Sequence, residues 1–533
     1  MMELPTALDG RRSTPTLDRW VLTRLGDVID VIRGVSYEKQ DSRDAPADGL
    51  VPILRATNIG AGLDFDDLVY VPSANVSAEQ RLRRGDSVIA ASSGSRSVVG
   101  KAAMLAVPWH GSFGAFCFAL RPRTVVEPGF LYLFLQTSTY RNRVSELAAG
   151  VNINNLRRNH IEETPFLLPP KEEQRRIVDE VEKQFTRLDA AVAGLQRVKA
   201  NLRRYRASVL KAACEGRLVP TEAELARREG RSFESGEELL KRILKERRAR
   251  WEADQIARME AAGKVPPDSD WKARYREPEP VSTDKASKPQ AWAVASLRQL
   301  AFIGSGNTPK GIEAAISASG PVPWFRVSDM NLPGNDHQMR GGTAFLTRES
   351  ARALGLRLFG VGAVIFPKRG GAIATNKKRI LVMPSATDLN IMAAEPVGCI
   401  SPWLHLWFRQ LKLGRLADGS NVPQINHGDV EPLPVPVPPL LEQERIVVEV
   451  ERRLSLVDEL EATVEKNLAR CARLRQSILK MAFEGRLVPQ DPNDEPASIL
   501  LERIREERAQ AKPQAHGVKA GSGARKRRRR SGL

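Results

Sequence analysis

The sequence predicts an α+β protein in which two mixed α/β domains alternate with two long helices as a pseudo-two-fold internal repeat. The first observation is a duplication: residues 169–220 align without a gap to residues 438–489, and 25 of the 52 positions are identical. The second is an α-helical period of apolar residues through both copies. The third is the length of 533 residues, which leaves room for a domain of about 150 residues before each copy.

The repeat also predicts where the segments of the chain begin and end. Weaker similarity extends outside the helices, since Trp20 stands before the first copy as Trp292 stands before the second. A proline-rich, charged stretch between the halves is typical of a linker. The predicted segments are domain 1 at residues 1–168, a central long helix with a helical coda at 169–263, the linker at 264–291, domain 2 at 292–437, a distal long helix with its coda at 438–511, and a basic disordered tail at 512–533.

Each copy of the repeat is expected to form one helix of about 40 residues, which is about 60 Å long. A Pro-Pro pair opens each copy, at Pro169 and Pro438, and Gly216 and Gly485 end the helical period. A helix of this length with a single apolar stripe needs a partner. We expect the other copy to be that partner in a coiled coil; the alternative is that each helix packs only on its own domain.

Inside the two domains, short apolar runs predict buried strands and longer ones predict helices. The order of the strands is not predictable from the sequence. The expected strands are Ser87–Ala91, Ala115–Leu120, Ala363–Phe366 and Arg379–Met383, and the expected helices are Phe130–Leu147 and Trp403–Leu416.

Composition excludes several classes of protein and favours a soluble, cytoplasmic one. The four cysteines are far apart and form no Cys-x-x-Cys pair, so neither a disulfide scaffold nor a zinc ribbon is expected. The sequence contains no secretory signal and no apolar stretch long enough to cross a membrane. The net charge of +18 suits a polyanionic partner, although +8 of it lies in the tail at 512–533.

Three stretches resemble catalytic or nucleotide-binding motifs, and each departs from the pattern. Phe302–Gly306 resembles the loop that holds S-adenosylmethionine in methyltransferases, but no Asn/Asp-Pro-Pro-aromatic tetrapeptide accompanies it. Gly94–Ala102 has one residue too many for a phosphate-binding loop and lacks Ser or Thr after its lysine. The carboxylates of Pro267–Lys272 lie in the predicted linker. We therefore expect no catalytic residue, no cofactor and no metal in this chain.

The repeated helices carry a family resemblance. Each is headed by Pro-Pro-x-x-Glu-Gln-x-Arg-Ile-Val, at Pro169–Val178 and Pro438–Val447, and closed by Glu-Gly-Arg-Leu-Val-Pro. With two variable domains between them, this pattern resembles the specificity subunit of a type I restriction-modification system over roughly residues 20–510. Asn421–Asn426 is similar to the short polar segment before the family's helices, whereas Gly150–Leu156 lacks its Pro-Gln pair.

The resemblance implies a function for each part. Each domain would be a target recognition domain for one half of a split, asymmetric sequence in double-stranded DNA. The helices would pair antiparallel, set the spacing of the half-sites and dock two modification subunits, which methylate adenine with S-adenosylmethionine. Restriction and translocase subunits, which use ATP and Mg²⁺, would join for cleavage. The chain itself would be non-catalytic and would not contact a membrane.

Polar and basic side chains near the ends of predicted strands are the candidates for DNA contacts, because such side chains distinguish base edges and bind phosphates. Different residues at matched places in the two domains predict different half-sites. The candidates are Arg55, Thr57, Asn58, Ser92, Ser93 and Arg96 in domain 1, and Arg326, Ser328, Asp329, Lys368, Arg369, Asn376 and Lys377 in domain 2.

Two other functions remain open from the sequence. One is a single-chain adenine-specific DNA methyltransferase that carries its own recognition domains, although the sequence lacks the catalytic loop of such an enzyme. The other is a coiled-coil adaptor that binds proteins and does not bind DNA. Binding of S-adenosylmethionine by the purified chain would favour the first, and absence of sequence-selective footprinting by the assembled complex would favour the second.

Overall fold

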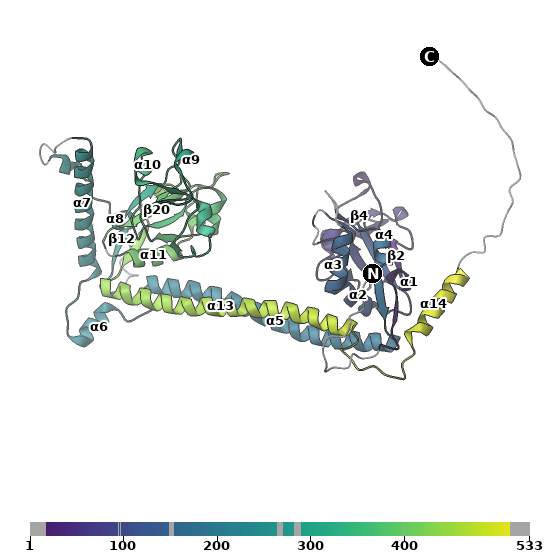
Figure 1. Ribbon diagram of the computed structural model, residues 1–533. Helices are drawn as coiled ribbons and strands as arrows, with labels where there is room; N and C mark the ends of the chain where they lie inside the picture. The colour runs from purple at the N-terminus through teal and green to yellow at the C-terminus, as the bar shows by residue number, and fades with distance from the viewer. Residues whose placement is uncertain are drawn as a thin grey trace, which may run out of the picture. The chain divides into compact units, whose positions relative to one another are not determined.

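The computed structural model describes residues 17–93, 95, 98–148, 154–263, 270–281, 289–398 and 400–511. The chain forms two compact units: unit 1 comprises residues 1–195 and 466–533, and unit 2 comprises residues 196–465. Each unit contains one mixed α/β domain and part of each long helix (Figure 1). The prediction of mixed α/β domains with long helices is therefore confirmed.

Domain 1 lies in unit 1 and is a set of small sheets covered by helices. Its elements are β1 (Val21–Arg24), α1 (Leu25–Val28), β2 (Ile29–Arg33), β3 (Leu50–Leu54), β4 (Val69–Pro72), β5 (Ser87–Ala90), β6 (Ser92–Ser93), β7 (Ala102–Met104), β8 (Ser112–Phe113), β9 (Cys117–Pro122), α2 (Pro128–Gln136), α3 (Ser138–Leu147), β10 (Asn154–Asn155), α4 (Arg158–Glu162) and β11 (Pro165–Leu168). The sheets have the orders β2-β9-β5-β7, β4-β3-β8, β1-β11 and β10-β6.

Domain 2 lies in unit 2 and repeats this plan. Its elements are β12 (Ala293–Ser296), α8 (Leu297–Leu300), β13 (Ala301–Ser305), α9 (Ile312–Ala315), β14 (Val322–Phe325), β15 (Gln338–Met339), β16 (Phe345–Leu346), α10 (Arg348–Ala353), β17 (Val364–Pro367), β18 (Arg379–Leu381), β19 (Ala386–Thr387), β20 (Ile391–Pro396), α11 (Ser401–Gln410), α12 (His427–Val430) and β21 (Pro434–Val437). The sheets have the orders β13-β20-β17-β18-β15, β16-β14-β19 and β12-β21.

The two domains share one strand order in their other sheets, while β15 is an added strand of domain 2 and the β10-β6 pair belongs to domain 1. An equivalent backbone hydrogen bond in each domain establishes which residues correspond. The N–H of Ala91, after β5, donates to the carbonyl of Phe116 at 2.8 Å, and the N–H of Lys368, after β17, donates to the carbonyl of Asn390 at 2.8 Å. Lys368 in domain 2 therefore occupies the place of Ala91 in domain 1, and Asn390 occupies the place of Phe116.

The structure corrects one predicted element of domain 1. The expected single helix at Phe130–Leu147 is two helices, α2 and α3, that meet at Thr137. The hydroxyl oxygen of Thr137 accepts a hydrogen bond from the N–H of Tyr140 at 3.2 Å, so it caps α3. The apolar run ends at Leu135 and the polar residues Gln136–Thr139 span the junction, so the capping threonine was the local signal of the break. The four expected strands each overlap an observed one.

The repeated segments form the helices α5 (Lys171–Cys214) and α13 (Leu440–Phe483), each of 44 residues. Each ends at a glycine with a left-handed backbone, Gly216 at φ 68° and Gly485 at φ 66°. Ion pairs join the helices inside each unit. In unit 1 Asp189 pairs with Arg475, and in unit 2 Arg206 pairs with Glu461 at 3.0 Å.

The repeated Glu-Gln motif forms a joint between each domain and the helix that follows it. The indole N–H of Trp20 donates to Glu173 at 3.0 Å in unit 1, and that of Trp292 donates to Glu442 at 2.9 Å in unit 2. The neighbouring Gln174 donates its side-chain N–H to the carbonyl of Pro169 at 2.9 Å. The same contacts in both units therefore explain why the two Glu-Gln motifs are identical.

The short helices after each long helix attach to the domain that shares their unit. They are α6 (Glu222–Glu229) and α7 (Gly236–Ala261) after α5, and α14 (Ala497–Ala511) after α13. The N–H of Gly236 donates to the carbonyl of Ala291 at 2.7 Å, and the N–H of Ala497 donates to the carbonyl of Arg19 at 3.1 Å. A side chain at Gly236 would place its Cβ 2.2 Å from the carbonyl oxygen of Val437, so only glycine fits there.

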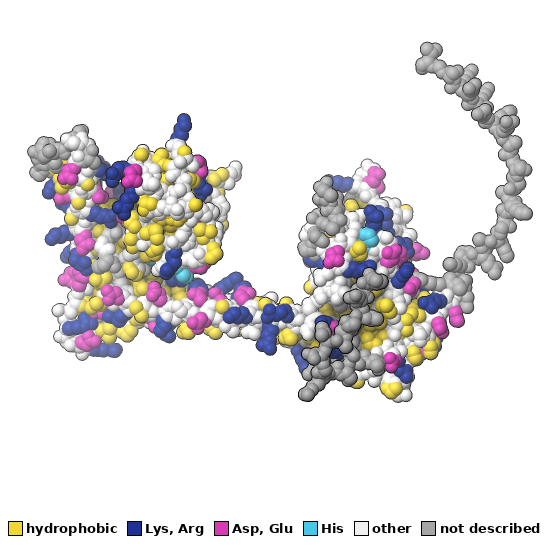
Figure 2. Space-filling model, viewed as in Figure 1, with side chains coloured by type: hydrophobic (Ala, Val, Ile, Leu, Met, Phe, Trp, Pro, Cys, Tyr) yellow, Lys and Arg dark blue, Asp and Glu magenta, His cyan; other side chains and the backbone are white. Residues whose placement is uncertain are grey.

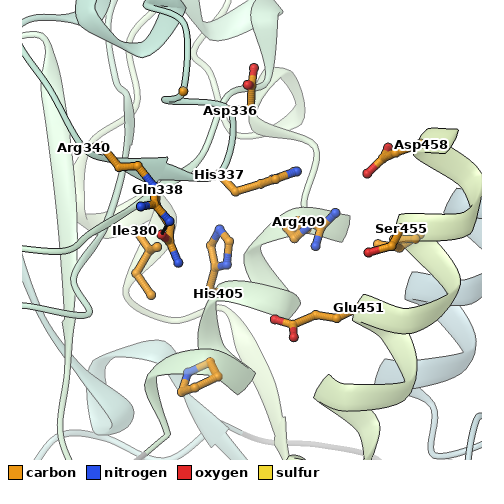
Figure 3. Close-up of a pocket in the computed structure, with 13 residues that line it drawn as sticks. Asp336, His337, Gln338, Arg340, Ile380, His405, Arg409, Glu451, Ser455 and Asp458 are labelled. Carbon is orange, nitrogen blue, oxygen red and sulfur yellow. Dashed lines mark hydrogen bonds between the residues drawn. The ribbon is translucent and has the colours of Figure 1, made fainter. Parts of the chain in front are cut away.

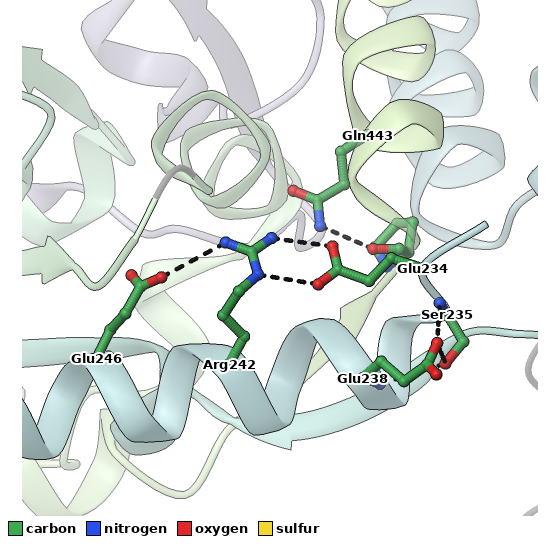
Figure 4. A network of polar contacts seen from close by, with 7 residues as sticks. Glu234, Ser235, Glu238, Arg242, Glu246 and Gln443 are labelled. Carbon is green, nitrogen blue, oxygen red and sulfur yellow. Dashed lines mark hydrogen bonds and ion pairs between the residues drawn. The ribbon is translucent and has the colours of Figure 1, made fainter.

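A polar network holds the start of α7 (Figure 4). The guanidinium of Arg242 donates to both carboxylate oxygens of Glu234 at 2.9 Å and contacts Glu246 at 3.4 Å. Ser235 and Glu238 exchange backbone and side-chain hydrogen bonds as a capping box. These bonds fix the direction in which α7 leaves the loop and runs along domain 2.

Candidate nucleic-acid interface

Two clefts flank an exposed aromatic ring at the carboxyl end of β5 in domain 1. The larger one, cleft A, has a volume of about 700 Å³ and is lined by residues that include Tyr37, Arg55 and Thr57. The smaller one, cleft B, has a volume of about 450 Å³. Phe116 lines both clefts, and its side chain is 69% exposed.

The backbone that carries Phe116 is firmly held. Its carbonyl oxygen accepts hydrogen bonds from the N–H groups of Ala91 at 2.8 Å and Ser92 at 3.2 Å. The next residue, Cys117, begins β9 and is fully buried. The ring of Phe116 therefore projects to solvent from a rigid support at the end of β9 and β5, the two middle strands of the sheet.

Cleft A brings together three of the residues predicted from the sequence, Arg55, Thr57 and Ser92. The guanidinium of Arg55 donates to the backbone carbonyl and to the carboxylate of Asp67, both at 2.7 Å. Thr57 is exposed and Ser92 is half-buried. The lining thus offers hydroxyl groups and one oriented guanidinium around an apolar floor.

Cleft B is basic and was not predicted from the sequence. It is lined by Arg33 at the end of β2, Asn155 in β10, and Arg157 and Arg158 at the start of α4. Arg158 forms an ion pair with Glu162 at 2.7 Å. Within the described part of the chain, no ion pair to Arg33 or Arg157 is found, so their charges are available to an anion.

Two of the predicted residues have a structural role. The side chain of Asn58 is 4% exposed and accepts a hydrogen bond from the N–H of Arg55 at 2.9 Å. Asp329 stands at the matching place in domain 2, is fully buried, and accepts from the N–H of Arg326 at 2.7 Å and from the hydroxyl of Thr343 at 2.8 Å. Both side chains cap a turn after a strand.

The matching surface of domain 2 is a hydrogen-bonded polar cluster. The ammonium of Lys368, a predicted residue, donates to the hydroxyl of Ser305 at 3.0 Å. That hydroxyl lies 3.1 Å from Nε2 of His427, whose Nδ1 lies 3.4 Å from Glu431. In the neighbouring segment, the side-chain N–H of Gln424 donates to the side-chain oxygen of Asn426 at 2.9 Å. Ser305, His427, Gln424 and Asn426 were missed, although the polar segment that holds the last two was noted.

Of the other predicted residues of domain 2, Arg369 adjoins this cluster, because its backbone forms an antiparallel bridge with Gln424. Asn376 adopts a left-handed backbone at φ 54°, and its side-chain oxygen accepts from the N–H of Leu413 at 2.9 Å. Lys377 contacts the side chain of Asn331. Ser328 and Arg369 are exposed. In domain 1, Ser93 belongs to β6 beside Ser92, and Arg96 lies outside the described residues.

A separate polar cavity of about 560 Å³ lies in unit 2 between domain 2 and α13 (Figure 3). His405 and Arg409 from α11 face Glu451 and Asp458 from α13 across it. Burial lowers the pKa of His405 to about 3, so this imidazole is neutral. Its Nε2 atom is buried and has no hydrogen-bond partner among the described residues.

The remaining observations concern surface charge, metal ligands and membrane spans. Basic and acidic side chains alternate over the surface of the long helices (Figure 2). No cluster of three or more His, Cys, Asp or Glu side chains suited to a metal ion occurs in the part that the structure describes. In the same part, no helix combines the length and the apolarity that a membrane span requires.

The stretch that resembles an S-adenosylmethionine loop is part of a sheet. Phe302, Gly304 and Ser305 lie in β13, which pairs with β20 along its whole length. The N–H of Gly306 donates to the carbonyl of Ile391 at 3.0 Å, and a Cβ on Gly306 would lie 2.2 Å from the carbonyl oxygen of Asp388. Gly306 therefore allows two backbones to approach each other.

Comparison with known proteins finds a matching domain and relatives of one kind. A family model described as the type I restriction modification DNA specificity domain matches residues 18–193. The chain is 28% identical over 505 residues to the type I restriction enzyme EcoKI specificity subunit of Escherichia coli K12, across 92% of this chain and 96% of that protein. It is 39% identical over 201 residues to the StySPI specificity subunit of Salmonella potsdam, across 38% of this chain and 43% of that protein.

The fold agrees with these matches. A solved structure, titled as the structural basis of complex assembly and conformational transition of the type I R-M system, aligns with a TM-score of 0.58 and 19% identity, over 88% of this chain and 98% of that one. Residues 18–193 therefore match a DNA specificity domain, and the second domain repeats its strand order in the main sheets. The chain is similar to specificity subunits of type I restriction-modification systems along nearly its whole length.

Proposed function

We propose that domain 1 and domain 2 each read one half of a bipartite, asymmetric target in double-stranded DNA. The observation that carries this proposal is the shared strand order combined with different side chains at matched places. Phe116 in domain 1 corresponds to Asn390 in domain 2, and Ala91 corresponds to Lys368. Two domains with the same strand order present the same face to DNA. Different side chains at matched positions on that face read different bases.

We infer that α5 and α13 form an antiparallel coiled coil, which sets the spacing between the half-sites and gives the chain its pseudo-two-fold repeat. In unit 2, Lys199 pairs with Glu465, and Arg206, further along α5, pairs with Glu461, earlier on α13. Residue numbers thus rise along one helix as they fall along the other. The buried residues Ile446, Val450, Leu454 and Val457 of α13 follow steps of three and four, as a coiled-coil seam requires.

The partners follow from the same reading. Leu441, Val448 and Leu460 on α13 are exposed apolar side chains, and we propose that two modification subunits cover such surface on the long helices. Those subunits supply S-adenosylmethionine and adenine methylation, and restriction subunits supply ATP, Mg²⁺ and cleavage. The chain contributes no catalytic residue and acts in the cytoplasm, without a membrane partner.

The proposed DNA contacts are the predicted residues whose side chains reach the surface. They are Arg55, Thr57, Ser92 and Ser93 in domain 1, and Arg326, Ser328, Lys368, Arg369 and Lys377 in domain 2. Asn58 and Asp329 are left out because they are buried, and Asn376 is left out because its side-chain oxygen accepts a hydrogen bond from the backbone of Leu413. Serine, threonine, lysine and arginine donors suit base edges and phosphates alike.

A domain exchange tests the proposal. Residues 292–437 are replaced by the corresponding domain of a related specificity subunit, and the chain is assembled with its modification subunits. Methylated adenines are then mapped in a genome that carries the complex. We expect one half-site to change and the other half-site and the spacing to stay the same. A change in both half-sites, or methylation without sequence selectivity, would contradict the proposal.

A further inference from the structure

Phe116 differs from an ordinary exposed apolar residue in its setting. Single exposed hydrophobic side chains are common on protein surfaces and need no explanation. Phe116, however, stands between cleft A and cleft B at the end of the central sheet, on a backbone that two hydrogen bonds hold in place. The ring is 69% exposed, so it makes few contacts within the chain. Most of its surface is available to a ligand.

The groups around the ring indicate what it meets. Arg33 and Arg157 on the cleft B side carry positive charge toward the solvent. Thr57 in cleft A and Ser92, which lines both clefts, carry hydroxyl groups. Phosphates bind to the first kind of group and base edges to the second. An apolar group placed between them matches the one apolar feature of the major groove, the 5-methyl group of thymine.

Domain 2 lacks this feature at the matching place. Asn390 replaces Phe116, and its side-chain amide donates to the carboxylate of Asp388 at 3.0 Å. Lys368, Ser305 and His427 fill the adjoining surface with polar groups. The aromatic contact therefore belongs to one domain and, by the proposed function, to one half-site.

We propose that Phe116 is a specificity-determining residue that packs on the methyl group of a thymine in the half-site read by domain 1, with Arg33 and Arg157 on the flanking phosphates. This inference rests on the proposed function. It assigns the thymine contact to a residue that lies outside the set predicted from the sequence.

The test uses the full chain assembled with its modification subunits. The target is first mapped by methylation with the wild-type complex. Duplexes are then made in which deoxyuridine replaces thymidine at one position of the half-site at a time, which removes only the methyl group. For the wild-type complex we expect one substitution to weaken binding about 5- to 10-fold, as a lost contact of about 1 kcal/mol implies. For Phe116→Ala we expect weak binding to both duplexes and no difference between them.

Val107→Ala is the matched control. Val107 is also an exposed apolar residue of domain 1, but it follows β7 near the amino end of β5, whereas Phe116 lies at the carboxyl end. We expect this variant to respond to deoxyuridine as the wild type does. Both variants should melt at the wild-type temperature, since neither side chain is buried.

The outcomes separate this inference from the proposed function. If the wild-type complex methylates selectively but Phe116→Ala keeps the deoxyuridine response, the inference is wrong and the proposed function stands. A half-site without thymine, or a loss of affinity in Phe116→Ala with the response retained, as a ring stacked between bases would produce, also overturns it. If the wild-type complex shows no sequence selectivity, the proposed function fails and the inference fails with it.

Discussion

Unit 1 and unit 2 attach their domains to the long helices through the same kinds of contact, yet the two domains present different surfaces. The tryptophan–glutamate joint and the buried acid that faces a helix arginine occur in both units. The surface around Phe116 has arginines and an aromatic ring, and its counterpart in domain 2 has a lysine, a serine and a histidine. Contacts that hold the repeat together stay alike, while surfaces directed at a ligand diverge.

The joints also differ in the number of arginines that pair with the buried acid, and the effect of this difference on stability can be measured. In unit 2, Glu222 after α5 pairs with Arg445 of α13 at 2.6 Å and also with Arg231. In unit 1, Asp494 after α13 pairs with Arg176 of α5 at 2.6 Å. Both carboxylates are buried, while the arginines are about one-third exposed.

The largest effect is expected when the buried acid of unit 2 is removed. Glu222→Ala leaves two arginines without their carboxylate, and we expect the local stability of unit 2 to fall by about 3 kcal/mol, at the low end for a broken buried pair because the arginines are partly solvated. Asp494→Ala should cost unit 1 about 2 kcal/mol. Hydrogen exchange of the amides in domain 2 and domain 1 measures the two effects separately. If either variant destabilised both units equally, the expectation that each acid stabilises its own unit would be wrong.

A smaller effect is expected at the tryptophan–glutamate joint. Glu442 accepts from the indole of Trp292 at 2.9 Å and from the N–H of Glu222 at 2.8 Å, whereas Glu173 accepts from the indole of Trp20 at 3.0 Å. Glu442→Ala should therefore cost about 2 kcal/mol and Glu173→Ala about 1 kcal/mol, since each leaves buried donors unpaired. Glu442→Gln is the control, because its amide oxygen still accepts one of the bonds. Thermal unfolding of the variants ranks them.

The same joint makes stability depend on pH. Burial raises the pKa of both Glu442 and Glu173 above the ordinary value of 4.5, against the lowering effect of their hydrogen bonds and of Arg445 or Arg176. The unfolded chain then loses these protons first as the pH rises, so folding becomes less favourable from the ordinary pKa up to the raised one. Glu442→Gln does not titrate, and its stability relative to wild type should increase across that window. A constant difference between the two proteins would show that Glu442 keeps an ordinary pKa.

The smallest effect concerns the arginines of cleft B. Arg33→Ala and Arg157→Ala should each weaken binding of the assembled complex to any sequence and reduce the slope of log affinity against log salt by about 0.9. The reason is that each substitution removes one phosphate contact, whereas neither arginine is proposed to contact a base. Arg158→Ala is the matched control, because the ion pair with Glu162 already engages that guanidinium. A change in sequence preference for Arg33→Ala would assign it to a base.

Much of the candidate surface could not be predicted from the sequence, for reasons that particular residues show. Arg33, Phe116 and Arg157 come from the end of β2, the start of β9 and the start of α4. They share no local pattern and meet only because the sheet order is β2-β9-β5-β7. Asn58 and Asp329 were predicted as contacts because a polar side chain after a strand can face a ligand. The same position also suits a turn cap, and both residues are caps.

The sequence by itself determined the duplication, the two long helices and the family resemblance. Identity at a constant offset and an apolar period of about 3.6 residues are local properties that survive without knowledge of the fold. The tertiary structure alone decided which strands are neighbours, which acid pairs with which arginine, and which side chains share a cleft. Glu222 and Arg445 are 223 positions apart in the chain. Only the packing of α13 against the segment after α5 brings their charges to 2.6 Å.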